Sequence, residues 1–63
     1  MKYSEVHQLL REAGCFILRN GSRHPVWKSP ITGLVFATSY HGSDEAKKGT
    51  LKIIEKRSGV KMK

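Results

Sequence analysis

The chain has 63 residues, of which 38% are hydrophobic and 27% charged, and this length accommodates one domain with a thin core. No apolar run approaches the ~20 residues that span a bilayer, and one cysteine cannot form an internal disulfide, so a membrane protein and a disulfide-stapled secreted miniprotein are both excluded. Twelve lysines and arginines against five acidic residues give a formal net charge of +7, which favours a polyanionic partner.

Most of this charge lies at the C-terminal end. Residues 1–46 carry five basic and four acidic side chains, a net of +1, whereas residues 47–63 carry seven basic and one acidic, a net of +6. Nucleic acid, an acidic protein and an anionic membrane surface would each suit such a segment. The N-terminus is polar where a signal peptide would be apolar, and with the single cysteine this leads us to expect a cytoplasmic protein.

The spacing of apolar residues near the N-terminus predicts a helix. Those that fall on one helical face are Val6, Leu9, Leu10 and Ala13. Ser4 can cap this helix, because its hydroxyl can accept a free backbone N–H of the first turn. Gly14 is expected to end it.

Three short strands are expected next, because short runs rich in branched and aromatic residues are separated there by turn-forming residues. They cover residues 15–19, 24–29 and 34–39. Turns at 20–22 and 30–33 link them. Since Pro25 has no backbone N–H, we expect the second strand to start at a sheet edge or in a non-bonded position.

A second helix is expected to begin near Lys47 or Lys48 and to end at Ser58, with Gly59 as its left-handed stop. The order is therefore α-β-β-β-α. Two short links favour an antiparallel meander with both helices on one face, an α+β fold. The expected core residues are Cys15, Phe16, Trp27, Phe36, Leu51 and Ile54.

Lysines recur every fourth residue along the second helix, at Lys48, Lys52 and Lys56, and so form one solvent-facing ridge. The ridge can follow the phosphates of a nucleic acid, or it can be an ordinary solvated basic face. Lys47 and the free N–H groups of the first helical turn favour the phosphate-binding interpretation, because a helix N-terminus itself attracts phosphate.

The turn Gly21-Ser22-Arg23-His24 holds the other concentration of reactive groups. An imidazole can take up or release a proton at cellular pH, and with cations that stabilise the phosphate it can cleave RNA without a metal. The alternative is that His24 is an ordinary surface histidine. Hydrogen bonding within the turn is the expected role of Ser22.

The remaining polar candidates are weaker. His7 is expected on the exposed flank of the first helix, with no function. His41, beside Gly42, could reach a ligand from its loop or simply be hydrated. The cysteine and histidines lack the short paired spacing of a zinc site, so we expect no metal and no cofactor.

Several segments, spread over nearly the whole chain, match the pattern of one family. They are Lys2-Tyr3-Ser4-Glu5, Leu9-Leu10 with Gly14, Asn20-Gly21-Ser22-Arg23-His24, His41-Gly42, Lys47-Lys48-Gly49-Thr50-Leu51-Lys52-Ile53-Ile54 and Ser58-Gly59-Val60. This pattern resembles the HicA-type toxins, the small mRNA-cleaving partners in HicA–HicB toxin–antitoxin pairs. Two positions of this chain depart from the family pattern. Where this chain has Pro25, relatives often carry an aliphatic or aromatic residue, and where it has Lys48, they often carry a proline.

The resemblance implies a double-stranded-RNA-binding-domain-like fold, ribonuclease activity on messenger RNA, and a HicB antitoxin that covers the active surface. It also implies that His24 is the essential residue. We expect RNA phosphates to be held by Arg23, Lys47, Lys48 and Lys52, and supporting roles for Ser22, Tyr40 and His41. A water, a lysine or Tyr40 would supply the second proton transfer.

We therefore expect one HicA-like domain over residues 1–63, a metal-independent endoribonuclease that is a monomer when free. Two alternatives remain. The chain could be a non-catalytic RNA-binding module that uses the basic second helix, with no role for His24. It could also be a basic protein whose only task is to pair with an acidic one.

Overall fold

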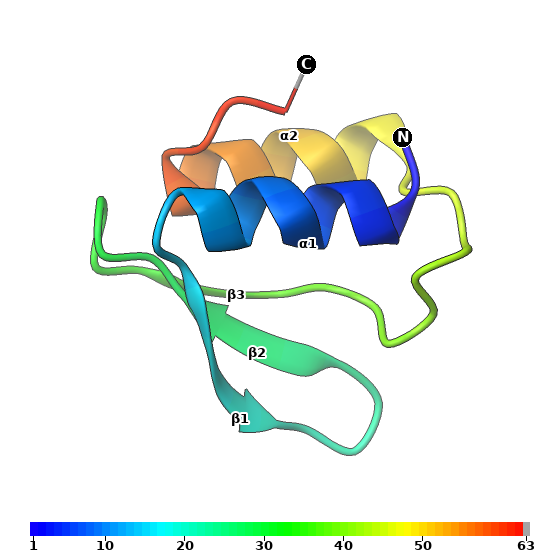
Figure 1. Ribbon diagram of the computed structural model, residues 1–63, viewed down its shortest axis with the longest axis horizontal. Helices are drawn as coiled ribbons and strands as arrows, with labels where there is room; N and C mark the ends of the chain where they lie inside the picture. Colours follow the sequence, from blue (N-terminus) through cyan, green and yellow to red (C-terminus); the bar gives the residue numbers. More distant parts are fainter. Residues whose placement is uncertain (63) are drawn as a thin grey trace.

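Two helices and three strands follow one another in the predicted order α-β-β-β-α (Figure 1). The computed structural model describes residues 1–62, and Lys63, the last cation of the basic segment, lies outside the described residues. The elements are α1 (Tyr3–Glu12), β1 (Phe16–Asn20), β2 (Pro25–Lys28), β3 (Val35–Ala37) and α2 (Lys48–Ser58). The strands form one antiparallel sheet in the order β1-β2-β3, and both helices cover one face of it (Figure 1). The predicted α+β fold of the double-stranded-RNA-binding-domain kind is confirmed.

The start of α1 differs from the prediction. The helix begins at Tyr3, so Ser4 lies inside its first turn and does not cap it. The loop before α2 supplies the missing acceptors instead: the Tyr3 N–H donates to the Asp44 carbonyl at 3.0 Å and the Ser4 N–H to the Gly42 carbonyl at 2.9 Å. The first turn is therefore satisfied by a segment about forty residues away in the chain, which a local capping rule does not consider.

Pro25 is the first residue of β2, and β2 is the central strand, so of the two positions expected for the proline the sheet edge is excluded. The strand tolerates the proline because the Pro25 carbonyl still accepts the Thr38 N–H, at 3.2 Å. Pro25 is fully buried. A strand can begin with proline in the middle of a sheet when no ladder partner needs its missing N–H.

Strand register decides which aromatic residues enter the core. Ile17, Trp27 and Phe36 lie opposite one another in neighbouring strands, and Trp27 and Phe36 are buried beneath the helices. Phe16 lies in the next row, with Lys28 and Val35, and alternation turns this row to the other face. Phe16 is accordingly 48% exposed, so its predicted place in the core is wrong.

The other core predictions are confirmed. Cys15 and Ile54 are buried, and Leu51 packs against the same cluster. Gly59 ends α2 with φ +74°, and its N–H donates to the Glu55 carbonyl at 2.9 Å. Within residues 1–62, neither helix has the length and apolar character that crossing a membrane requires.

Candidate functional site

The turn between β1 and β2 carries the predicted catalytic histidine. Its geometry depends on Gly21, whose N–H donates to the His24 carbonyl at 3.1 Å and so closes the turn. A Cβ atom at Gly21 would lie 2.6 Å from that same carbonyl oxygen, closer than side chains come. Glycine at this position is thus a steric requirement of the turn that presents His24.

The three side chains after Gly21 point into solvent. Ser22, Arg23 and His24 are all exposed, whereas the next residue, Pro25, is fully buried. The buried proline anchors the backbone directly behind the histidine, while the imidazole and the neighbouring guanidinium remain accessible. A base and a cation therefore follow one another on one exposed turn. Such groups can transfer a proton and stabilise the charge of a phosphate.

A second loop touches this turn. The Tyr40 hydroxyl, in the segment between β3 and α2, donates to the Gly21 carbonyl at 2.6 Å. The same segment supplies the carbonyls that bind the first turn of α1. The β1–β2 turn, this segment and the starts of both helices consequently lie at one end of the molecule (Figure 1).

The start of α2 is electropositive. Lys47 is its N-cap residue and Lys48 its first residue, and the first turn has neither a capping side chain nor an acidic residue. Lys52 follows one turn later, and all three side chains are exposed. Backbone N–H groups and ammonium groups there attract the same kind of ligand, an anion. His41 is exposed in the preceding loop, and its N–H donates to the Ser39 hydroxyl at 3.0 Å.

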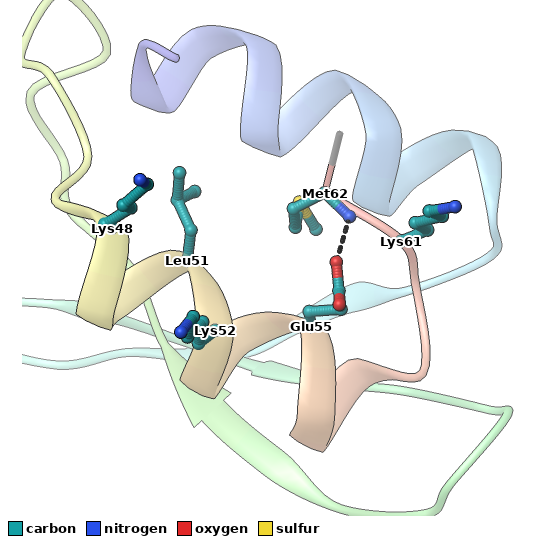
Figure 2. Close-up of a pocket in the computed structure, with 6 residues that line it drawn as sticks. All are labelled: Lys48, Leu51, Lys52, Glu55, Lys61 and Met62. Atoms are coloured by element: carbon teal, nitrogen blue, oxygen red, sulfur yellow. Dashed lines mark hydrogen bonds between the residues drawn. The ribbon is translucent and has the colours of Figure 1, made fainter.

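The flank of α2 contains a shallow hollow of about 270 Å³ (Figure 2). Its lining residues are Lys48, Leu51, Lys52, Glu55, Lys61 and Met62. Glu55 accepts the Met62 N–H at 2.7 Å, which holds the C-terminal tail against the helix. Sequence reasoning missed this tail. The apolar Met62, which follows the glycine that ends α2, could have indicated that the tail packs against the protein, and Met62 is buried.

His7 does not lie free on an exposed flank, as the sequence suggested. Its ring is partly buried and packs against Trp27, with ring centroids 5.3 Å apart and a tilt of 30° between the planes. Its Nε2 lies 2.8 Å from the Thr38 hydroxyl oxygen. That oxygen also accepts the Trp27 Nε1–H at 2.9 Å, and its own proton is free to donate to Nε2 of a neutral His7. Burial, and secondarily the positive charge of Arg11, lower the pKa of His7.

This pKa shift predicts that stability declines in mild acid. The folded chain holds His7 neutral, whereas the unfolded chain takes up its proton near pH ~6.5. The contribution of His7 to the free energy of unfolding is fully present above that pH. It is lost as the pH falls below it, because the unfolded state then binds more protons than the folded state. Urea unfolding of the wild type from pH 7.5 down to pH 5.5 should show a falling free energy of unfolding, and His7→Gln should flatten the decline. Parallel profiles for the two proteins would contradict this role.

The arrangement brings some predicted residues together and leaves others apart. Ser22, Arg23 and His24 share one turn, which Tyr40 contacts directly. Lys47 and Lys48 lie at the same end of the molecule, while Lys52 points outward farther along α2 (Figures 1 and 2).

One family model matches most of the chain. A family model described as the HicA toxin of bacterial toxin–antitoxin systems matches residues 3–60. Searches of the curated proteins and of the solved structures found no match. The family match includes both helices, all three strands and the His24 turn. The chain therefore belongs to the HicA toxin family and is a toxin component of a toxin–antitoxin system.

Proposed function

We propose that this toxin is a metal-independent endoribonuclease that cleaves messenger RNA in the cytoplasm, with His24 as its catalytic residue. The observation that carries the proposal is the exposed imidazole on a turn that Gly21 closes, beside Arg23 and at the end of the molecule where the basic helix α2 begins. Family membership supports a toxin with a cognate antitoxin.

The proposed reaction uses the RNA's own 2′-hydroxyl. As the 2′-oxygen attacks the adjacent phosphorus, its proton passes to a base, the P–O5′ bond breaks, and the departing 5′-oxygen takes up a proton. The products are a 2′,3′-cyclic phosphate and a 5′-hydroxyl. His24 performs one of the two proton transfers, and a water or a lysine performs the other. Arg23 stabilises the extra negative charge on the phosphate.

Binding of the strand is assigned to the lysines at the start of α2 and one turn along it. Lys47, Lys48 and Lys52 hold flanking phosphates and release their counterions. The exposed turn would be blocked by any protein that covered it, and we propose that a HicB-like antitoxin neutralises the free, monomeric toxin in this way. Ser22, exposed on the same turn, and His41, exposed in the loop before α2, support the substrate.

The proposal is tested by incubating the purified protein in EDTA with a single-stranded RNA and with a 2′-deoxy oligonucleotide of the same sequence. We expect the RNA to be cut into fragments with 2′,3′-cyclic phosphate ends and the deoxy control to stay intact, since it lacks the nucleophile. Cleavage of the deoxy strand would contradict the 2′-hydroxyl mechanism. Abolition of cleavage by EDTA would contradict metal independence.

A non-catalytic RNA-binding module is the second candidate. The uncapped, basic start of α2 favours it, because these groups bind phosphate whether or not His24 reacts. In the same assay this function would leave the RNA intact but bound. With Arg23, Lys47, Lys48 and Lys52 in contact, log affinity should fall against log salt with a slope of about −2.8, at ~0.7 per phosphate for single strands.

A further inference from the structure

Tyr40 makes a hydrogen bond that sequence reasoning did not anticipate. Its hydroxyl donates to the Gly21 carbonyl at 2.6 Å, and Gly21 in turn donates its N–H to the His24 carbonyl at 3.1 Å. The two bonds use opposite ends of the same glycine residue. A displacement of the Gly21 backbone is therefore transmitted directly to the residue that carries the imidazole.

Tyr40 is itself held on both sides along the chain. Two residues earlier, the buried Thr38 accepts the Trp27 Nε1–H at 2.9 Å and donates its own N–H to the Pro25 carbonyl at 3.2 Å. Two residues later, the Gly42 carbonyl accepts the Ser4 N–H at 2.9 Å. The hydroxyl thus extends from a backbone fixed to the core on one side and to α1 on the other.

This geometry argues against the proton-transfer role considered for Tyr40 from the sequence. A phenol has one O–H proton, and here that proton is engaged by a backbone carbonyl. What the bond can do is restrict the turn, which otherwise carries three exposed side chains in succession and has few packing contacts to order it.

We propose that Tyr40 is a positioning residue for His24: it fixes the Gly21 carbonyl and so orders the turn that presents the imidazole to RNA. The inference rests on the proposed ribonuclease function and assigns it a residue outside the His24 turn. The same turn requires glycine at position 21, since a Cβ there would push on the His24 carbonyl.

The test compares Tyr40→Phe with Tyr3→Phe, a matched removal of one phenol hydroxyl from α1. For Tyr40→Phe we expect kcat to fall about 10–100-fold, the range for an angstrom-scale misplacement of a reacting group, with RNA affinity within twofold of wild type. Tyr3→Phe should retain wild-type kcat. In ¹⁵N relaxation, the order parameters of Arg23 and His24 should fall in Tyr40→Phe from about 0.85 towards 0.6, and stay unchanged in Tyr3→Phe.

The two readouts separate the possible failures. An unchanged kcat in Tyr40→Phe would overturn the inference, and so would a lower kcat with unchanged order parameters, because Tyr40 would then act on the chemistry directly. A wild type that does not cleave RNA would refute the proposed function and with it the role in catalysis, while the relaxation data would still decide whether Tyr40 orders the turn. If Tyr40→Phe fails to fold, Gly21→Ala provides a second variant, because it disturbs the same turn from within. Gly21→Ala should lower kcat and keep the RNA affinity of the wild type.

Discussion

His24→Ala should abolish detectable RNA cleavage while leaving RNA affinity close to that of the wild type. General acid–base catalysis by a positioned side chain contributes ~10²–10⁴ in rate, and Arg23 and the lysines of α2 still hold the phosphates in the variant. The imidazole is exposed, and the turn is closed by the His24 carbonyl, which alanine retains. We therefore expect a stability change within about 0.5 kcal/mol, as for other surface substitutions.

Initial cleavage rates with excess RNA measure this effect, and filter binding at fixed salt measures affinity. Thermal unfolding of the variant shows whether the fold is kept. Added imidazole provides a chemical control, since a small base that diffuses to the vacated position should restore part of the rate. Cleavage at the wild-type rate by His24→Ala would remove this residue from the mechanism.

Leu10→Ala should remove a large part of the stability of the fold, from about one third upward. Leu10 is fully buried, on the face of α1 that packs against the sheet, and the truncation leaves a cavity that a thin core fills poorly. Such substitutions cost about 2–5 kcal/mol. At ~0.1 kcal/mol per residue, a chain of 63 residues has only about 6 kcal/mol in total.

The matched control is Leu18→Ala, the same truncation at a side chain that is 51% exposed on β1. Urea unfolding followed by tryptophan fluorescence measures both, because Trp27 lies in the core. We expect the midpoint to shift strongly for Leu10→Ala and little for Leu18→Ala. Equal shifts of the urea midpoint in the two variants would contradict the prediction that burial of Leu10 stabilises the fold.

The elements were largely predictable because the signals for them are local. Helical spacing from Val6 to Ala13 and the glycine stops at 14 and 59 act within one or two turns of chain, and the structure confirms both helices. The errors occur where a distant partner decides. Ser4 is not a cap because carbonyls near residue 42 reach the first turn of α1, and Phe16 is outside the core because of its register with Lys28.

The candidate site divides in the same way. The sequence places Ser22, Arg23 and His24 on one turn because three consecutive residues after a turn-forming glycine cannot be far apart. It offers no means of predicting the Tyr40 contact, which joins residues 19 positions apart through one side chain. Nor does it reveal the surroundings of His7, whose ring packs on a tryptophan 20 positions later in the chain.

By itself, then, the sequence determined the order of the elements, the basic character of the second helix and the family, because periodicity, charge and motif spacing are properties of neighbouring residues. Only the tertiary structure decided which hydroxyl supports the His24 turn, which aromatic rings are buried and why His7 is held neutral. Each of these depends on a contact between segments that are distant in the sequence. Strand register and the path of the loops determine such contacts, and both are defined only in the folded chain.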